Sequence, residues 1–217
     1  MDGIPDDETW RLVERVEGAR EVALLRKGRH HGIVVDGVFL MSTDQTVSER
    51  DMVRIAVHEL GCDITVLIGG LGVGAGVDEA ARHGVRRVVV AETEPVVVRW
   101  WREHFRGTGS AEPEIVLADV HDVLLRHDPG GLDAVLLDTD NGPDWLSSPA
   151  NARLYTADGL ELVESRLRPG GCAVYWSSAP SAVFEERLHG VFSDVRRVDV
   201  DRGDVPPDVL YVARSAA

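Results

Sequence analysis

The feature that most constrains the fold is a series of short apolar runs after Gly61. The apolar runs predict strands at residues 64–68, 87–91, 114–117, 134–137 and 171–176, and amphipathic helical segments lie between them. A continuous apolar run is typical of a strand with both faces buried, and parallel strands need a crossover connection, usually a helix. The pattern therefore predicts an α/β fold whose mostly parallel sheet has helices on both faces. A helix at 181–189 and a last strand at 209–213 complete it.

The residues before Gly61 follow a different pattern. Short apolar stretches between residues 21 and 42 are separated by glycine turns, which predicts two or three short antiparallel strands. Thr46 and Glu49 then have the spacing of a capping box, and apolar residues continue at helical spacing to Gly61. We expect a small β-appendage followed by one helix.

Length and charge set further bounds. At 217 residues the chain can bury one substantial core, so we divide it into an N-terminal β-hairpin appendage with a helix, residues 1–60, and one α/β domain, residues 61–217. The acidic start lacks the basic and apolar regions of a signal peptide, and no apolar run could span a bilayer, which predicts a cytoplasmic protein without a membrane partner. The formal net charge of −14 argues against nucleic acid as a partner, because that binding rests on clustered Lys and Arg.

The strongest local signal is a glycine-rich turn between the first strand of the α/β part and the next helix. Its glycines are Gly69, Gly70, Gly72 and Gly74. Glycines let the backbone approach a ligand closely, and the N-terminus of the following helix presents free N–H groups. A tight turn that binds nothing is the alternative, so the turn by itself is weak evidence for a nucleotide site.

Acids at the ends of neighbouring strands strengthen this interpretation. Glu92 ends the second strand, about 20 residues after the glycine turn, where an acid can hold a ribose diol. Asp119 follows the third strand and can accept a hydrogen bond from an adenine amino group, and Asp138 and Asp140 follow the fourth. The carboxyl ends of parallel strands form the edge at which ligands bind, so these acids predict a nucleoside site there. For Glu92 the alternative is a solvated acid at a strand end.

With these motifs the sequence resembles the spermidine synthase family, from about residue 35 to residue 177. Ile-Gly-Gly-Leu-Gly-Val-Gly at 68–74 is similar to that family's Ile-Gly-Gly-Gly-Asp-Gly-Gly loop, and Glu-Thr-Glu-Pro at 92–95 to its Glu-Ile-Asp-Pro. Leu-Tyr-Thr at 154–156 is similar to its Leu-Phe-Thr. Leu-Arg-Pro-Gly-Gly at 167–171 resembles a Leu-Lys-Pro-Gly-Gly that many methyltransferases share.

The resemblance implies the Rossmann-like fold of the class I S-adenosylmethionine-dependent methyltransferases, with a mostly parallel seven-stranded sheet. It implies a transferase whose cofactor is S-adenosylmethionine or its decarboxylated form, with Glu92 on the ribose, Asp119 on the adenine and Asp138 at the reacting centre. It also implies a homodimer assembled through the N-terminal strands. The residues expected to bind the cofactor are Gly69, Gly70, Gly72, Gly74, Glu92, Thr93, Asp119, Val120 and Asp138.

The sequence departs from the family pattern on the side that recognises the amine. The family's Asp-Ser-Ser-Asp-Pro-x-Gly-Pro is shortened to Asp-Thr-Asp-Asn-Gly-Pro at 138–143, and the loop aspartate that in the family contacts the aminopropyl amine falls at Gly72. The Asp-Gly-Val-x-Gln stretch is matched at 36–40 without its glutamine, and the family's Tyr-His-Glu is matched only by Ser-Glu-Arg at 48–50.

Catalysis on a carbon bonded to a sulfonium needs mainly alignment and a nucleophile with a free lone pair. Asp138 is the candidate base that takes the proton of an amine acceptor, with Asp140 as its helper. The alternative is that Asp138 caps the next loop or contacts the cofactor. The histidines show no metal-ligand spacing, so no metal is expected.

The small-molecule acceptor is expected to contact aromatic side chains. Trp176 ends a predicted strand, and Trp145 lies in a loop that can close over the pocket; with Tyr155 they are the candidate substrate-binding residues. For Trp176, plain core packing is the equal alternative. Three functions follow: aminopropyl transfer from decarboxylated S-adenosylmethionine to an amine, methyl transfer from S-adenosylmethionine to a small molecule, and a catalytically silent nucleoside-binding protein.

Overall fold

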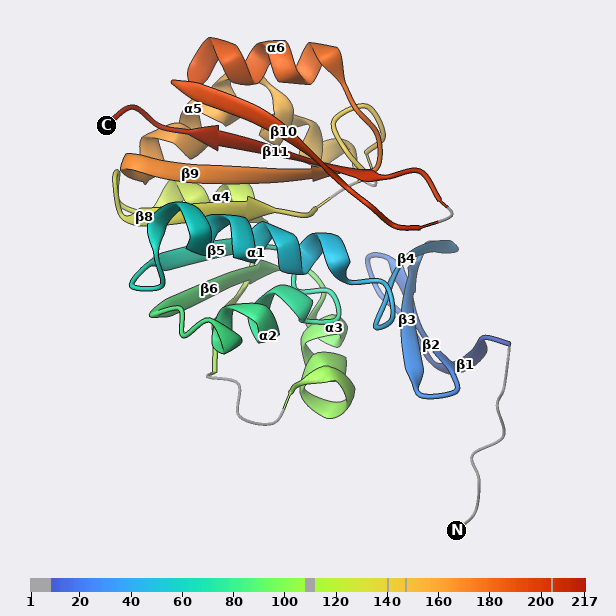
Figure 1. Ribbon diagram of the computed structural model, residues 1–217. Coiled ribbons are helices and arrows are strands. Elements are labelled where there is room, and N and C mark those ends of the chain that lie inside the picture. The colour runs from blue at the N-terminus through green and yellow to red at the C-terminus, as the bar shows by residue number, and fades with distance from the viewer. Residues whose placement is uncertain (1–8, 108–111, 140, 147, 204) are drawn as a thin grey trace.

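The computed structural model describes residues 9–107, 112–139, 141–146, 148–203 and 205–217, and it has the predicted α/β architecture (Figure 1). The N-terminal sheet consists of β1 (Arg11–Glu17), β2 (Glu21–Lys27), β3 (His30–Val35) and β4 (Val38–Ser42). The larger sheet consists of β5 (Thr65–Gly69), β6 (Arg87–Glu92), β7 (Glu114–Leu117), β8 (Leu132–Leu137), β9 (Leu167–Ser177), β10 (Asp194–Val200) and β11 (Asp208–Arg214). The helices are α1 (Val47–Leu60), α2 (Ala75–Arg82), α3 (Pro95–Trp100), α4 (Val120–Arg126), α5 (Ala157–Arg166) and α6 (Ala182–Val191), with a π-helical turn at Trp101–Phe105 and a 3₁₀ helix at Pro149–Tyr155.

The larger sheet has seven strands in the order β10-β11-β9-β8-β5-β6-β7, as the resemblance implied. β11 is antiparallel to both of its neighbours, and the other adjacent pairs are parallel. The chain adds β6 and β7 on one side of β5, and β8 and β9 on the other. The order therefore reverses between β5 and β8, and in open α/β sheets ligands bind in the crevice at such a reversal.

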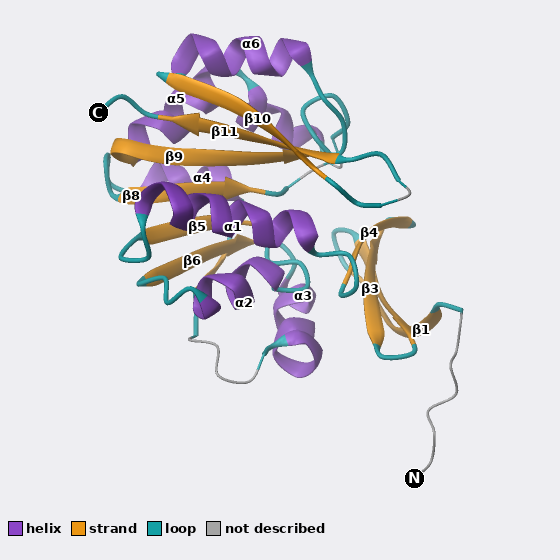
Figure 2. Ribbon diagram, in the orientation of Figure 1, coloured by secondary structure: helices purple, strands orange, loops and turns teal. Residues whose placement is uncertain are grey.

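Helices cover both faces of the larger sheet (Figure 2). α1, α2 and the α3 region bury side chains such as Met52 and Trp101 in one core. α4, α5 and α6 bury Leu124 and Phe184 in the other. Burying one such large apolar side chain contributes roughly 1.5–3 kcal/mol, so the two cores hold the strand ends in fixed positions.

Two strands were missing from the expectation. β1 makes the N-terminal sheet four-stranded, and β10 forms the edge of the larger sheet. Both strands are mostly exposed and carry charged residues between the apolar ones. An edge strand of this kind has no continuous apolar run, which is why the apolar pattern did not reveal it.

The starts of two elements also differ from the expectation. α1 is confirmed, but its capping box is wrong: the Thr46 side chain makes no capping bond and accepts a hydrogen bond from Nε of Arg50 at 3.2 Å instead. The helix before β9 ends at Arg166 and β9 begins at Leu167, four residues before the expected strand.

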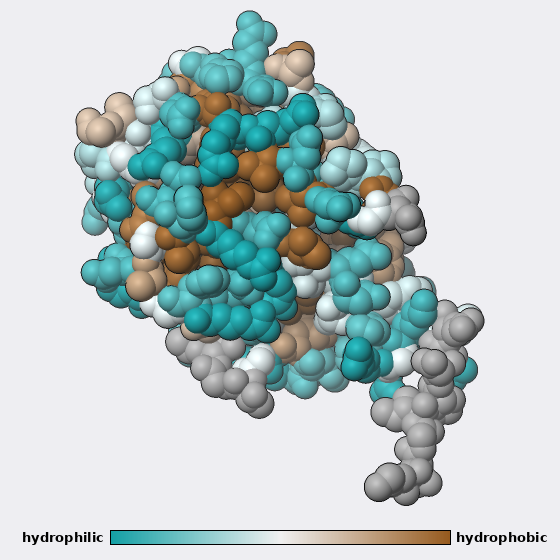
Figure 3. Space-filling view, in the orientation of Figure 1, coloured by the Kyte–Doolittle hydropathy of each residue, from teal (hydrophilic) through white to brown (hydrophobic). Residues whose placement is uncertain are grey.

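The acids of this chain are mostly on its surface. Figure 3 shows hydrophilic side chains over much of the face on which α1 and α2 lie, with apolar side chains visible between them. Among the described residues, the acids that are buried are Glu79, Glu92 and Asp208. Burying a carboxylate is costly unless it is paired or hydrogen-bonded, so each of these three side chains needs polar partners in the fold. No helix in the described ranges is both long and apolar enough to cross a membrane.

Candidate active site

The glycine turn is fastened to both strands that flank β5. The backbone N–H of Gly70 donates to the carbonyl oxygen of Ala91 at the end of β6, at 2.9 Å. The N–H of Asp138, directly after β8, donates to the carbonyl oxygen of Gly69 at 3.2 Å. These two bonds place the turn and Asp138 side by side at the point where the strand order reverses.

Positive φ angles and close contacts explain the glycines in this turn. Gly70 has φ +95°, and a Cβ there would lie 2.7 Å from the carbonyl oxygen of Asp138. Gly72 has φ +52°, and a Cβ there would collide with the Sδ of Met41. A Cβ on Gly74 would collide with Nε1 of Trp101. The turn thus accommodates groups of this chain itself, and of the four predicted glycines Gly70 and Gly72 line the smaller of the two cavities described below.

Glu92 braces the turn from β6. One carboxylate oxygen accepts from the N–H of Leu71 at 2.9 Å, and the other accepts from Thr93 at 2.7 Å and Glu94 at 2.9 Å. A carboxylate offers about four acceptor positions, so one remains for a ligand hydroxyl. The ribose role of Glu92 and the role of Thr93 stay predictions.

Asp119 is held by its own chain at the start of α4. Its carboxylate accepts from the N–H of His121 at 2.8 Å and pairs with Nη2 of Arg153 at 2.9 Å. Val120 is buried in the core under α4. Neither residue lines the two cavities described next, so contact with an adenine stays a prediction for both.

Two adjoining cavities open beside the glycine turn. The larger, of about 660 Å³, lies between the β4–α1 segment, the loop after β8, the end of β9 and the β10–β11 segment. The smaller, of about 30 Å³, lies between α1, the glycine turn and the end of β8. Both cavities are lined by Met41, Glu49 and Asp138.

The larger cavity is strongly acidic. Among the described residues, one guanidinium, that of Arg202, lines it together with five carboxylates: Asp44, Glu49, Asp138, Asp201 and Asp208. An excess of carboxylates at a concave surface attracts cations and raises their local concentration. The geometry therefore suits a positively charged ligand better than an anionic one.

Asp208 lines this cavity, is buried and has a polar partner on each carboxylate oxygen. It accepts from Oγ of Ser48 at 2.5 Å and pairs with Nη1 of Arg202 at 2.8 Å. The second guanidinium nitrogen of Arg202 donates to Oε1 of Gln45 at 3.1 Å. These contacts tie the start of α1 to the start of β11, 160 residues along the chain.

Glu49 has an unusual acidity. Burial and, to a smaller extent, the nearby Asp208 carboxylate raise its pKa to about 7, against the opposing effects of its own backbone N–H, Arg50 and Arg202. Glu49 therefore changes its charge near neutral pH. Perturbed acids in a cavity are candidates for a functional role.

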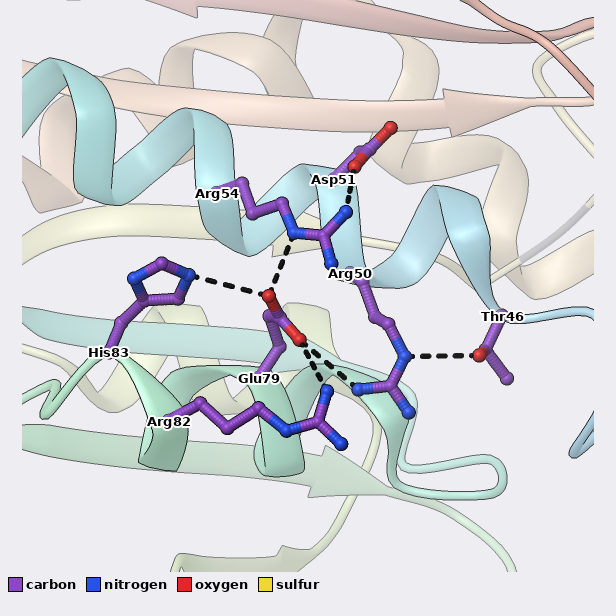
Figure 4. A network of polar contacts seen from close by, with 7 residues as sticks. All are labelled: Thr46, Arg50, Asp51, Arg54, Glu79, Arg82 and His83. Atoms are coloured by element: carbon purple, nitrogen blue, oxygen red, sulfur yellow. Dashed lines mark hydrogen bonds and ion pairs between the residues drawn. The ribbon is translucent and has the colours of Figure 1, made fainter.

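A network around Glu79 fixes the part of α1 that carries Glu49 (Figure 4). Glu79 of α2 accepts from Nε of Arg54 at 2.8 Å, Nη1 of Arg50 at 3.1 Å and Nη1 of Arg82 at 3.0 Å. Burial alone would raise the pKa of Glu79, but the hydrogen bonds from Arg54 and Arg50 lower it to about 2. Glu79 is thus ionised at neutral pH and holds α1 against α2.

Comparison with known proteins agrees with this geometry. No protein-family model matches the chain. It is 35% identical over 182 residues to polyamine aminopropyltransferase 2 of Pseudomonas aeruginosa, an alignment that covers 75% of this chain and 50% of the relative. The chain thus resembles a polyamine aminopropyltransferase in sequence, and it spans about half the length of this curated relative.

Solved spermidine synthases share the fold of this chain. The enzyme from Thermotoga maritima superposes with a TM-score of 0.78 at 15% identity, covering 95% of this chain and 73% of that one. A spermidine synthase in complex with the transition-state analogue AdoDATO also has a TM-score of 0.78 at 15% identity, covering 95% and 74%. At this identity the likeness establishes the fold, including the class I methyltransferase-like sheet.

The predicted substrate residues are placed in three different settings. Trp176 lines the larger cavity at the end of β9. Trp145 is 64% exposed and does not line either cavity. Tyr155 is buried on the other face of the sheet, with its ring 5.4 Å from that of Phe184, and is likewise absent from both linings. Asp140 lies outside the described residues, so its role as a helper of Asp138 stays a prediction.

The larger cavity is also lined by residues that the sequence did not single out for a site. They line the larger cavity from the β4–α1 and β10–β11 segments and include Asp44, Glu49, Asp201, Arg202 and Asp208. Nothing in a linear pattern places the second segment beside the first. One signal existed: Glu49 stands where the Tyr-His-Glu of the resembled family is expected, although the capping-box spacing explained it otherwise.

Proposed function

We propose that this protein is a group transferase that moves an aminopropyl group from decarboxylated S-adenosylmethionine to an amine acceptor. The observation that carries the proposal is the acidic cavity of about 660 Å³, which reaches Asp138 beside the glycine turn. An amine acceptor is a cation at neutral pH, and five carboxylates against one guanidinium suit it. The name of the Pseudomonas relative and the AdoDATO complex of a neighbour with the same fold support the same chemistry.

The residues at the sheet edge fit such a donor. Glu92 keeps one acceptor position, which suits a ribose hydroxyl, and the backbone at Gly70 and Gly72 borders the smaller cavity. Thr93, Asp119 and Val120 complete the proposed nucleoside site, together with Gly69 and Gly74 of the turn. When bound, the donor supplies a carbon activated by its bond to a sulfonium sulfur.

Asp138 is the proposed general base. The acceptor nitrogen must lose a proton before its lone pair can form the new C–N bond, while the C–S bond breaks and its electron pair leaves with the neutral thioether. Asp138 lies where both cavities meet, so its carboxylate can take that proton and hold it as a carboxylic acid. General base catalysis contributes about 10²- to 10⁴-fold, and alignment of the two reactants supplies much of the remainder.

Calorimetric titration tests the proposal. The purified protein is titrated separately with decarboxylated S-adenosylmethionine, S-adenosylmethionine and methylthioadenosine, and release of methylthioadenosine is then followed by chromatography with a series of α,ω-diamines. We expect all three to bind, the decarboxylated donor most tightly, and turnover with a diamine. Preference for S-adenosylmethionine would instead favour methyl transfer, binding without turnover would favour a silent homologue, and binding of none of the three would refute a sulfonium site.

We further propose that the protein acts in the cytoplasm as a homodimer, without nucleic acid or membrane partners. The support for a dimer is a set of exposed apolar side chains on the N-terminal sheet: Leu12, Val13, Val38, Phe39 and Leu40. Light scattering coupled to size-exclusion chromatography measures the mass directly. The division of the chain at residue 60 also stays a proposal, since α1 packs in the core of the larger sheet.

A further inference from the structure

The smaller cavity is apolar except at two points. Its walls come from side chains such as Met41, Met52 and Leu136 and from the glycine turn, and the acids in its described lining are Glu49 and Asp138. At about 30 Å³ it holds a short alkyl chain or a few small groups rather than a whole substrate. It opens toward the larger cavity at the residues that both share.

The glycine turn itself offers no charge to this cavity. Gly72 has no side chain, and the Sδ of Met41 occupies the direction in which a side chain at position 72 would point. With Asp138 assigned to the acceptor nitrogen, a cation that enters beside the turn finds its counter-charge on the opposite wall. That wall is the first turn of α1, which carries Glu49.

We propose that Glu49 is the carboxylate that binds the primary ammonium of the aminopropyl chain of the donor. The inference rests on the function proposed above and deepens it. Asp138 then acts on the acceptor nitrogen, and Glu49 holds the far end of the transferred chain. An ammonium placed in an apolar cavity requires such a partner, because an unpaired buried charge is costly.

The charges around Glu49 are consistent with this role. On the elements that border the two cavities these groups are Asp44, Arg50, Asp138, Asp201, Arg202 and Asp208. Arg50 is engaged by Glu79, and Arg202 by Asp208. The surroundings of Glu49 are therefore net acidic, which favours its protonated form in the free protein and its ionised form once a cation is bound.

Glu49 also determines which sulfonium is accepted. The decarboxylated donor presents an ammonium, whereas S-adenosylmethionine presents an additional carboxylate that Glu49 would repel. Methylthioadenosine has the nucleoside but no aminopropyl chain. Removing the charge of Glu49 should therefore weaken binding of the decarboxylated donor and leave binding of methylthioadenosine unchanged. It should also reduce the preference for the decarboxylated donor over S-adenosylmethionine.

Titration of wild type, Glu49→Gln, Glu49→Asp and the matched control Glu161→Gln tests this inference, each at pH 6, 7 and 8. Glu161 is exposed on α5. We expect Glu49→Gln to lower the affinity for the decarboxylated donor about tenfold or more at pH 8, because one charge-assisted hydrogen bond is lost. Its affinity for methylthioadenosine should stay within twofold of that of wild type. Glu49→Asp should recover part of the loss. Wild-type affinity for the donor should rise from pH 6 to 8, because Glu49 ionises in that range, and Glu49→Gln should lose this dependence.

Two results would overturn the inference while the proposed function stands: unchanged donor affinity in Glu49→Gln, or an equal loss of donor and methylthioadenosine affinity. A wild-type protein that binds none of the three ligands would overturn the proposed function itself. The two failures are therefore separable in one set of titrations.

Discussion

Glu79→Gln removes one charge from the network that joins α1 to α2, and its effect follows from the structure. The pKa of Glu79 falls from the ordinary 4.5 to about 2 because hydrogen bonds from Arg54 and Arg50 outweigh the effect of burial. Each pKa unit is worth about 1.4 kcal/mol, so the gap corresponds to about 3 kcal/mol. The Glu79 side chain is 4% exposed, but Arg54 and Arg82 are 49% and 62% exposed, and solvent screening reduces the expected loss to about 2–3 kcal/mol.

The pH dependence gives the prediction its sign. A carboxylate whose folded pKa is depressed stabilises the fold fully above its unfolded pKa, here 4.5, and loses that contribution as the pH falls toward the folded value of about 2. The difference between wild type and Glu79→Gln should therefore be largest at pH 7 and fall to about half or less at pH 3.

Urea unfolding followed by circular dichroism measures both quantities. Wild type, Glu79→Gln and Glu161→Gln are unfolded at pH 7, 4 and 3, and the free energies of unfolding are compared at equal denaturant slope. The Glu161 variant should match wild type, since that side chain is exposed. A destabilisation at pH 7 below about 0.5 kcal/mol, the usual range of a surface substitution, or one that stays constant from pH 7 to pH 3, would refute the reasoning.

Asp138→Asn should lower turnover about 10²- to 10⁴-fold while methylthioadenosine still binds in calorimetry, and unchanged turnover would remove the base assignment. Gly70→Ala should weaken methylthioadenosine binding and cost roughly 1–3 kcal/mol in urea unfolding, because φ is +95° and the new Cβ would press on the carbonyl oxygen of Asp138; a stable variant with full affinity would contradict this. Ser48→Ala should cost about 1–3 kcal/mol by leaving buried Asp208 short of a donor, and wild-type stability in the same assay would show that the bond contributes little.

Much of the fold could be predicted because buried parallel strands have an unmistakable pattern. The apolar runs marked six strands of the larger sheet, and the acids after three of them marked its ligand-binding edge. β10 and β1 were missed because exposed edge strands share their alternation of charged and apolar residues with loops. An apolar sequence pattern indicates a buried strand, and these two strands are mostly exposed.

The candidate site was predictable on one side only. Asp138 and Gly70 follow directly from strand ends, and the structure brings them together. Glu49 and Asp208 come from segments 159 residues apart, which meet through tertiary packing that no local spacing encodes. The side-chain partners of the site residues could not be predicted from the sequence either. The ion pair of Asp119 with Arg153, for example, depends on where the 3₁₀ helix before α5 lies.

The walls of the larger cavity come from two different parts of the fold, and this division has an evolutionary consequence. One side is the edge of the parallel sheet, where a change would disturb the core. The other side is the pair of segments between β4 and α1 and between β10 and β11, which are joined to each other by Ser48, Asp208 and Arg202. Under the function proposed above, substitutions in these segments other than at Glu49 would alter which amine fits while the proposed nucleoside side is left intact. A lineage with this architecture could then diversify its acceptor without rebuilding the half of the site proposed to hold the sulfonium.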